Sequence, residues 1–150
     1  MSQENVEVIE RLLERPSDPA QDLASLFRND AQWQAWIEEF APFFHPDWET
    51  LRRTALGEEG IHTGFEGSRS LWLGWLEPWE SYRVVVERVI DCGERILGLT
   101  HDHARPWGSE AEVVLPSPAG VWTFRDGRIA RLDIYDERDE ALKAVGLEEG

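Results

Sequence analysis

The spacing of apolar residues along the chain changes from a helical period to a strand period near its middle. In the first half, apolar side chains recur every three or four residues, as they do on the buried stripe of an amphipathic helix. In the second half, segments rich in β-branched residues alternate with turn sequences, which is typical of strands joined as hairpins. We therefore expect an α+β domain, in which helices come first and lay their apolar stripes on one face of a curved antiparallel sheet.

The helical half predicts four helices and one long loop. Pro16 and Pro42 end two of the periodic segments, because proline does not continue a helix. Four glycines between residues 50 and 67 favour a loop of the kind that often forms a lid or a pocket rim. The predicted helices cover residues 3–14, a segment that begins at Ser17, a segment that follows Asn29 and Asp30, and residues 68–78.

The second half predicts four strands and a closing helix. Pro116 and Pro118 interrupt the third strand, because proline cannot donate to the hydrogen bonds of a sheet and so marks a bulge or an edge. The sequence Arg-Asp-Gly-Arg at 125–128 is a strong signal for a hairpin between the last two strands. The predicted strands cover residues 82–90, 95–105, 110–124 and 129–135, and the helix covers residues 139–145.

The composition limits what kind of protein this chain is. Its 150 residues are 41% hydrophobic, which suits one core, so we expect a single domain over residues 1–150. A formal net charge of −15 repels nucleic-acid phosphates and anionic lipid surfaces, so neither is an expected partner. Cys92 has no second cysteine to pair with, and no apolar run is long enough for a signal peptide or a membrane span. We therefore expect a cytoplasmic protein.

Three stretches of the chain carry a family resemblance: MSQENVEVIERLLE, GFEGSRSLWLGWLEPWESYRVVVERVIDCGERIL and VWTFRDGRIARLDIYDERDEALKAVGL. Together they resemble the SnoaL-like branch of the nuclear-transport-factor-2-like superfamily. The resemblance covers nearly the whole chain. It implies a cone-shaped, cystatin-like sheet wrapped around N-terminal helices, in a homodimer joined through the outer sheet face. Relatives include polyketide cyclases, ketosteroid isomerases, dehydratases and epoxide hydrolases.

The resemblance also implies where a catalytic acid would lie. In the cyclases a carboxylate on the last strand acts as acid and base, and the matching residue here is Asp133. In the isomerases the base is an aspartate directly before a proline, and the matching residue here is His45. The second isomerase aspartate falls near Gly120, where this chain has no acid. The chain therefore lacks the set of acids used for steroid isomerisation.

Strand alternation makes Asp133 the main catalytic candidate. On an alternating strand it shares one face with Arg131 and Tyr135. Ile129 lies on that face too and should point to the core, so we expect all of them to face the cavity. A carboxylate in a dry pocket has a raised pKa and can move protons near neutrality, and Arg131 would hold it or polarise a substrate oxygen. The alternatives are a carboxylate that an arginine neutralises without a catalytic task, and an arginine at the surface.

Three histidines are further candidates. His45 is either a general base or ligand contact, or a residue that caps the end of a strand. His101 and His103 lie two residues apart and so share one face of a strand, which suits two metal ligands. A third ligand is not evident, so we expect no metal site. The alternatives for this pair are contacts to a ligand on a concave face, or one side of a half-exposed strand.

The eight tryptophans favour an aromatic cavity. Such a lining suits a small apolar ligand, such as a planar polycyclic compound or a terpenoid. The expected ligand-binding residues are Trp48 and Trp107, both beside turns, together with Tyr135 and the two histidines at 101 and 103. The tryptophans expected in the core are Trp33, Trp72 and Trp75.

These observations favour a SnoaL-like enzyme of the cyclase, isomerase or dehydratase type that needs no metal or organic cofactor. Asp133 would move a proton on a small apolar carbonyl compound, and Arg131 or a histidine would stabilise the oxyanion. Two alternatives stay open. One is a non-catalytic protein that binds a similar ligand, which the missing isomerase acids favour. The other is a metal-dependent enzyme that uses His101 and His103.

Overall fold

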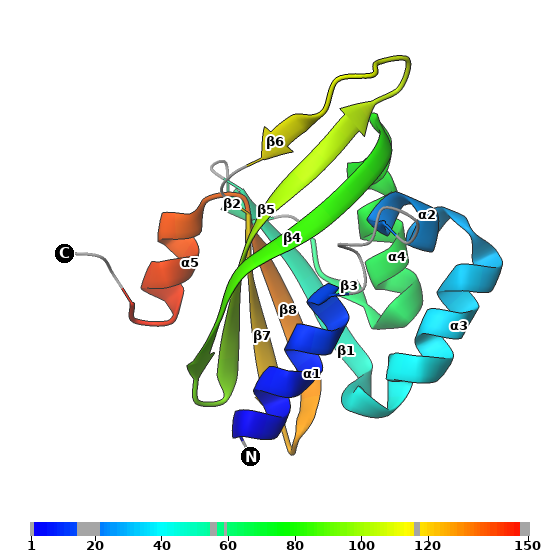
Figure 1. Cartoon of the computed structure of the whole chain (residues 1–150). Coiled ribbons are helices and arrows are strands. Elements are labelled where there is room, and N and C mark those ends of the chain that lie inside the picture. The colour runs from blue at the N-terminus through cyan, green and yellow to red at the C-terminus, as the bar shows by residue number, and fades with distance from the viewer. Residues whose placement is uncertain (1, 15–21, 55–56, 59, 116–117, 148–150) are drawn as a thin grey trace.

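The structure of the chain is a computed structural model that describes residues 2–14, 22–54, 57–58, 60–115 and 118–147 (Figure 1). Its helices are α1 (Ser2–Glu14), α2 (Leu23–Arg28), α3 (Asp30–Phe40), the 3₁₀ helix η3 (Ala41–Phe43), α4 (Gly64–Leu76) and α5 (Arg138–Ala144). Its strands are β1 (Phe44–Thr54), β2 (Gly57–Glu58), β3 (His62–Thr63), β4 (Trp79–Cys92), β5 (Arg95–Pro106), β6 (Val113–Leu115), β7 (Ala119–Arg125) and β8 (Arg128–Tyr135). Within the described ranges, none of the helices has the length and hydrophobicity that a membrane crossing requires.

The strands form one curved, open sheet of order β2-β1-β8-β7-β5-β4, in which β3 also pairs with β1 and β6 also pairs with β5. The expected α+β fold with N-terminal helices on a curved sheet is confirmed. The sheet is mixed rather than wholly antiparallel, however, because β1 and β8 run parallel. A parallel pair needs a long connection, and here residues 55–127, about half of the chain, lie between the two strands. Local patterns do not reveal such a pairing.

The helices divide between the two faces of the sheet (Figure 1). Figure 1 shows α1 to α4 together on one side, where α1 and α2 contact β4 and α4 contacts β1. Their core cluster includes Ile96 and Trp122 from the strands, whereas Leu142 of α5 packs in a second cluster with Leu97. Because Ile96 and Leu97 are neighbours on β5, they point to opposite faces. We call the face under α1 to α4 the inner face and the face under α5 the outer face.

Most of the predicted helices are confirmed, with one shifted start. The helices expected over 3–14, after Asp30 and over 139–145 correspond to α1, α3 and α5. The second helix begins at Leu23, because the Asp22 side chain caps it by accepting a hydrogen bond from the backbone of Ser25. The predicted start at Ser17 lies outside the described residues.

The prediction of a loop over residues 50–67 is wrong. β1 continues to Thr54, and both β2 and β3 pair with it before α4 begins at Gly64. Gly64 has a φ of 71°, a left-handed conformation that glycine adopts without steric cost. Gly64 therefore allows a sharp change of direction between β3 and α4. The helix expected over 68–78 begins four residues earlier than its apolar stripe indicates.

The predicted strands of the second half are confirmed. The strand expected over 110–124 is interrupted, as its prolines predict, and forms β6 and β7, which both pair with β5. The last hairpin turns at Asp126 and Gly127, with φ values of 53° and 78°. Positive φ at both central residues is the signature of the tight turn that joins two twisted strands.

A β-bulge in β8 changes which of its residues face the helices. Phe124 of β7 pairs with Ile129, but Thr123 pairs with Arg131, so Ala130 has no partner across the ladder. An extra residue in one strand reverses the alternation of every side chain beyond it. Ile129 faces the inner core, and after the bulge the inward positions are the even-numbered ones, 132 and 134.

Candidate functional site

Two adjoining chambers lie between the helices and the inner face of the sheet. The first, which we call the apolar chamber, has a volume of about 120 Å³. Its lining includes Phe27, Trp33, Trp36, Phe44, Trp48, Trp72, Val84, Gly98, Asp102, Gly120, Trp122 and Leu132. The second, which we call the polar chamber, has a volume of about 250 Å³. It is lined by Arg52, Leu71, Trp72, Trp75, Tyr82, Asp102, Leu115, Pro118, Ile134, Tyr135 and Asp136.

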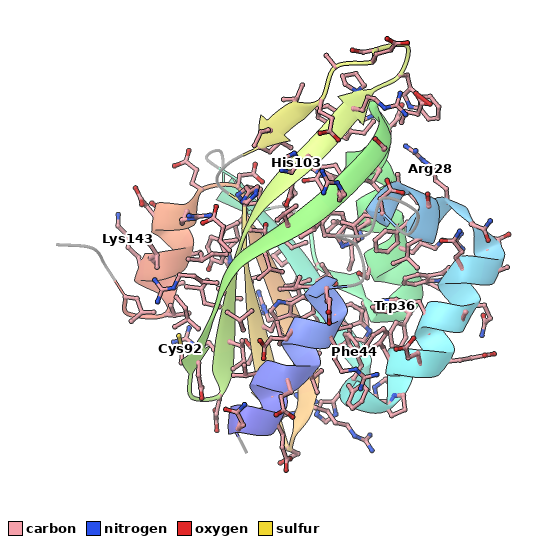
Figure 2. The ribbon with its side chains drawn as sticks, viewed as in Figure 1. Arg28, Trp36, Phe44, Cys92, His103 and Lys143 are labelled. Carbon is pink, nitrogen blue, oxygen red and sulfur yellow. The ribbon has the colours of Figure 1, made fainter. Side chains whose placement is uncertain are left out.

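Aromatic side chains from three helices build the wall of the apolar chamber. Trp33 and Trp36 lie one helical turn apart on α3 and stack with ring centroids 5.2 Å apart. Phe27 of α2 stacks on Trp72 of α4 at 5.7 Å. Figure 2 shows Trp36 and Phe44 side by side where α3 meets the start of β1, and their rings are 5.8 Å apart. The tryptophans at 33 and 72, expected in the core, thus also line the cavity.

Two glycines keep the sheet side of this chamber open. Gly98 of β5 and Gly120 of β7 pair directly across the ladder. A methyl group on Gly98 would lie 3.1 Å from Leu13 Cδ1, and one on Gly120 would lie 3.3 Å from Leu132 Cδ1. The isomerase resemblance would put an acid near Gly120, and a side chain at that glycine requires Leu132 to shift by a few tenths of an ångström.

Asp102 of β5 is the chemically distinctive residue of the site. It is only 3% exposed and borders both chambers. Among the described residues that line the apolar chamber, it is the sole ionisable one. Its carboxylate accepts a hydrogen bond from the hydroxyl of Tyr82 and another from Thr100 Oγ1 at 3.0 Å.

Burial changes the acidity of this pair. Desolvation raises the pKa of the Asp102 carboxyl, and the hydrogen bonds from Tyr82 and Thr100 oppose that rise only in part. The pKa of the Tyr82 hydroxyl is also raised, first by desolvation and then by the nearby charge of Asp102. Asp102 is thus a stronger base than an ordinary surface carboxylate, and Tyr82 keeps its proton as a hydrogen-bond donor.

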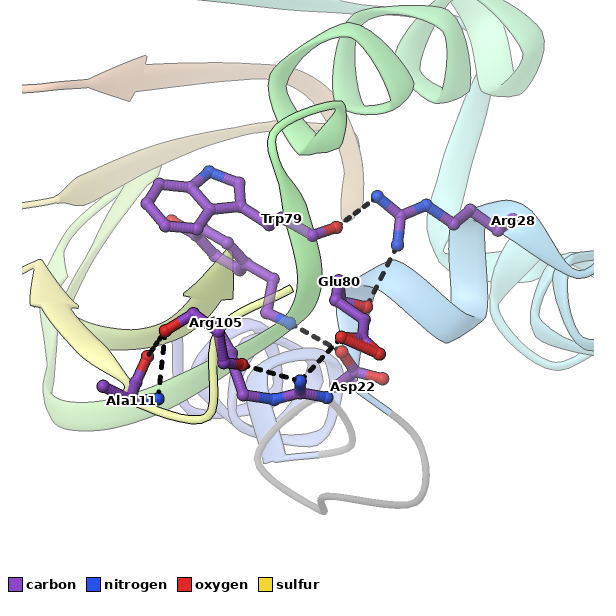
Figure 3. A network of polar contacts seen from close by, with 8 residues as sticks. Asp22, Arg28, Trp79, Glu80, Arg105 and Ala111 are labelled. Atoms are coloured by element: carbon purple, nitrogen blue, oxygen red, sulfur yellow. Dashed lines mark hydrogen bonds and ion pairs between the residues drawn. The ribbon is translucent and has the colours of Figure 1, made fainter. Parts of the chain in front are cut away.

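A second buried acid positions Tyr82. Asp22 accepts from the backbone N–H of Tyr82 at 2.6 Å and from Ser25 Oγ at 2.6 Å. The same carboxylate therefore begins α2, which lines the apolar chamber, and holds the strand that carries Tyr82. Nearby, Arg28 donates to the carbonyls of Trp79 and Glu80, as Figure 3 shows, and so joins the end of α2 to the start of β4.

The polar chamber contains an ion pair. Arg52 Nε and Nη2 donate to the two carboxylate oxygens of Asp136 at 3.1 Å and 3.0 Å. The guanidinium carbon of Arg52 lies 3.9 Å from the ring centroid of Trp75, which is close enough for a cation–π contact. The guanidinium group is thus held between a carboxylate and an aromatic ring.

The expectation that Asp133 points into the cavity is wrong. The bulge at Ala130 turns it to the outer face, where it is 7% exposed and pairs across the sheet with Val121. Its carboxylate accepts from Arg53 Nε and from Arg131 Nε, both at 3.1 Å. Neither Asp133 nor Arg131 lines either chamber, so this geometry matches the alternative of an acid neutralised by arginines. Their catalytic roles stay a prediction.

The histidines also lie outside the two chambers. His45 Nε2 donates to the carbonyl of Arg125 at 2.6 Å and so holds the end of β1 against the last hairpin. His101 and His103 lie on the outer face with ring centroids 5.3 Å apart, and each contacts a glutamate, Glu87 at 3.1 Å or Glu112 at 3.5 Å. The described residues contain no group of three or more acids, histidines or cysteines that could hold a metal ion.

The aromatic candidates separate into two groups. Trp48 lines the apolar chamber and Tyr135 borders the polar chamber, so both lie where the sequence predicts a ligand, although binding itself stays a prediction. Trp107 is 59% exposed in the turn after β5, donates from Nε1 to the carbonyl of Glu77 at 3.1 Å, and stacks on Arg28. It lines neither chamber.

Sequence reasoning missed Asp102 and Tyr82. The signal was the segment from Thr100 to His103, in which two hydroxyl or carboxyl groups alternate with two histidines. We assigned importance to the face with the histidines. Because Ile96 on the same strand packs in the inner core cluster, the even-numbered face is the inner one, and it carries Thr100 and Asp102. An acid that shares its strand face with Ile96 and Ala104 is an indication of function that the pattern contained.

Comparison with known proteins agrees with this architecture. The model of a family described as the SnoaL-like domain matches residues 27–132. A search of curated proteins finds no match to the sequence.

Several solved structures have a similar fold. A protein assigned as a SnoaL-like polyketide cyclase, from Jannaschia sp. CCS1, aligns over 89% of this chain and 85% of its own, at 17% identity and a TM-score of 0.61. TerC, crystallised with polyporic acid, aligns over 95% of this chain and 98% of its own, at 19% identity and a TM-score of 0.59. A hypothetical protein of ketosteroid isomerase-like fold from Catenulispora acidiphila DSM 44928, in complex with trimethylamine, aligns over 83% of this chain and 88% of its own, at 16% identity and a TM-score of 0.54. These identities show a shared fold and nothing finer.

Proposed function

This chain belongs to the SnoaL-like domain family, and from that premise we propose that it is a small-molecule pocket protein that moves a proton on an apolar carbonyl compound, with Asp102 as the acid and base. The proposal keeps the reaction type that the sequence indicates and changes the residue that performs it. The observation that carries it is a buried carboxylate with a raised pKa, hydrogen-bonded to Tyr82, at the junction of two chambers.

The proposed reaction begins with Asp102 as a carboxylate. It removes a proton from a carbon next to the ligand carbonyl, so that a C–H bond breaks, an O–H bond forms on Asp102, and the electron pair moves onto the carbonyl oxygen. The neutral Asp102 then attracts the hydroxyl of Tyr82 less strongly, and that hydroxyl can donate to the ligand oxyanion. Return of the proton to another ligand atom gives an isomerisation. Attack of the enolate carbon on a second carbonyl, followed by transfer of the proton from Asp102 to the new alkoxide, gives a cyclisation.

Two features of the site support this chemistry. Asp102 is only 3% exposed and borders a chamber with an aromatic wall, and such low exposure to water strengthens the electrostatic interactions of its carboxylate. A carboxylate that lacks an arginine or lysine partner among the described lining residues of that chamber keeps its basicity, in contrast to Asp133 between Arg53 and Arg131. The similarity to a protein assigned as a polyketide cyclase and to TerC, crystallised with polyporic acid, makes carbonyl-rich ring compounds the first ligands to test.

Hydrogen exchange on candidate ligands tests the proposal directly. Polyketide and terpenoid ketones are incubated with the protein in D₂O, and mass spectrometry follows deuterium entering next to the carbonyl. This readout detects proton removal even when the overall product has the same mass as the substrate. We expect Asp102→Asn to slow the exchange by about 10²–10⁴-fold, as expected for the loss of a general base.

Asp133→Asn is the matched control, because both aspartates are buried acids on central strands. We expect this variant, if circular dichroism shows it folded, to exchange the ligand at the wild-type rate. Wild-type exchange in a folded Asp102→Asn protein would overturn the proposal. Loss of exchange in Asp133→Asn alone would support the residue that the sequence favours.

A second candidate function is a non-catalytic protein that binds the same kind of ligand. It is favoured by the fact that hydroxyl groups of Tyr82 and Thr100 already satisfy both oxygens of Asp102, as in a purely structural buried pair. Binding of a ligand with no deuterium uptake and no new product masses would support this function. Asp102-dependent uptake would exclude it.

The homodimer that the resemblance implies is also a proposal. The outer face would supply the interface, and α5 covers only the part of that face near Leu97 and Val121. The half-exposed part beside it carries charged residues such as Arg131, which pairs with Glu49 at 3.9 Å. Sedimentation equilibrium of wild type and Arg131→Glu measures the oligomeric state, and a monomer at all concentrations would exclude the dimer. Cytoplasmic location stays a prediction.

A further inference from the structure

The two chambers differ in character and share part of their lining. Four residues line both of them: Trp72, Asp102, Pro118 and Ile134. A molecule in either chamber can therefore contact these four residues. Because Asp102 is among the shared residues, a ligand that spans the junction places its middle against the carboxylate.

The apolar chamber suits one uncharged ring. A cavity of about 150 Å³ lined by apolar side chains binds benzene, and this chamber of about 120 Å³ is similar in size. Its described lining offers aromatic and aliphatic surface and only one ionisable group, Asp102. A charged group in this chamber would lose its hydration, and within the described lining the Asp102 carboxylate alone could offset a positive charge.

The described lining of the polar chamber contains one guanidinium group and two carboxyl groups. The charge of Arg52 is already matched by Asp136 through two hydrogen bonds, and the second carboxyl group belongs to Asp102. An anionic group would be repelled by Asp136 and by the Asp102 carboxylate. A cationic group would be attracted by Asp102 but repelled by Arg52, and burial would remove its hydration. A neutral hydroxyl or carbonyl group, by contrast, can donate to a carboxylate oxygen or accept from the guanidinium group without disturbing the pair.

We infer that the ligand is a neutral two-part molecule: a ring that occupies the apolar chamber, joined to a short hydroxyl- or carbonyl-bearing arm that passes Asp102 into the polar chamber. This inference names the substrate class of the proposed site and rests on the proposed function for its location. The reacting carbon lies where ring and arm meet, because the carboxylate lies at that junction.

Four simple probes of one shape test the choice of charge. Propylbenzene, phenylpropanol, phenylpropanoate and phenylpropylammonium share a ring and a three-carbon arm but differ at its end. Their dissociation constants are measured on the full-length protein by NMR titration of the tryptophan indole signals. We expect phenylpropanol to bind about tenfold or more tightly than either ion, since each ion must bury a charge beside a matched pair. We also expect it to bind more tightly than propylbenzene.

A paired substitution tests the part played by the polar chamber. In Arg52→Leu with Asp136→Leu, both members of the ion pair are removed, so neither charge is left alone. We expect phenylpropanol and propylbenzene to have similar dissociation constants for this double variant. The matched control is Arg11→Gln with Glu39→Gln, which removes an ion pair of 3.3 Å that lines neither chamber, and it should leave the four constants unchanged.

Each other outcome overturns a specific part of the reasoning. Tightest binding of phenylpropanoate or phenylpropylammonium would overturn the inferred charge preference, and equal binding of phenylpropanol and propylbenzene would overturn the role of the polar arm. Both results leave the Asp102-dependent exchange of the proposed function untouched. Val84→Phe fills the apolar chamber, and unchanged binding of all probes to this variant would overturn the site itself, and with it the proposed function. The order of the four dissociation constants on wild-type protein tests the charge preference even if a variant does not fold.

Discussion

Replacing Asp22 with alanine tests whether one buried carboxylate couples α2 to the strand of Tyr82. Asp22 accepts from Ser25 N at 3.3 Å and from Ser25 Oγ at 2.6 Å at the start of α2, and from Tyr82 N at 2.6 Å on β4. Loss of a helix cap costs about 1 kcal/mol. A buried N–H left without an acceptor costs about 1–3 kcal/mol in addition. We therefore expect Asp22→Ala to lower the free energy of unfolding by about 2–4 kcal/mol.

Asn29 provides a matched control for this prediction. Its side chain caps α3 by accepting from Gln32 N at 3.0 Å, but the residue is exposed and this is a bond within one helix start. Asn29→Ala should therefore cost only about 1 kcal/mol, the value for a helix cap alone. Urea denaturation followed by tryptophan fluorescence gives both free energies of unfolding, and the excess for Asp22→Ala measures the bond to Tyr82.

Equal losses in the two alanine variants, within about 0.5 kcal/mol, would refute the reasoning. Such a result would mean that the Tyr82 N–H finds another acceptor or water once the carboxylate is gone. The exchange assay adds a functional readout to the same proteins. We expect Asp22→Ala to slow deuterium uptake and Asn29→Ala to leave it unchanged, because only Asp22 holds the backbone of Tyr82, whose hydroxyl donates to Asp102.

Two further predictions concern the site. Burial raises the pKa of the Asp102 carboxyl in the folded protein above its ordinary value of 3.8. The folded state therefore binds this proton more tightly than the unfolded state does. As the pH falls through the folded pKa, Asp102 takes up the proton and destabilises the folded protein less. Urea titrations between neutral pH and about pH 4 give the free energies of unfolding of wild type and Asp102→Asn. We expect the wild-type value minus the variant value to increase as the pH falls. A constant or falling difference would contradict the raised pKa. Gly120→Ala places a methyl group 3.3 Å from Leu132 Cδ1 and should lower stability by about 1–3 kcal/mol and weaken propylbenzene binding. Unchanged stability and binding would show that the chamber relaxes around the added group.

Features that depend on neighbours in sequence were predictable. The helices α1, α3 and α5, the interruption of the strand between β6 and β7, and the last hairpin all follow from apolar periodicity, proline and the Asp126-Gly127 pair. Each depends on interactions within a few residues, so the residues themselves carry the information. The loop expected over 50–67 failed for the opposite reason, since β2 and β3 are strands only because β1 lies beside them.

In the candidate site, too, local features were predictable from the sequence and features that depend on strand alignment were not. The sequence predicted an aromatic cavity with Trp48 and Tyr135 as ligand contacts. In the structure Trp48 lines the apolar chamber and Tyr135 borders the polar chamber, and binding stays a prediction. It assigned the acid to Asp133, because strict alternation from Ile129 puts both residues on one face. The ladder between β7 and β8 contains one extra residue at Ala130, which moves Asp133 to the outer face. A bulge depends on how two strands align, and no pattern within one strand reveals it.

The sequence by itself determined most of the helices, the strands of the second half and the apolar stripes that form the core. Those properties are local, because periodicity, caps and turns act within a few residues. Only the tertiary structure decided which acid lies in the cavity. Asp102 gains its raised pKa from packing against elements far away in the chain, and Asp133 gains Arg53 as a partner from β1, 80 residues away. Solvent exclusion and partner charge are set by packing, so the chemistry of a carboxylate is known only after the sheet has its register.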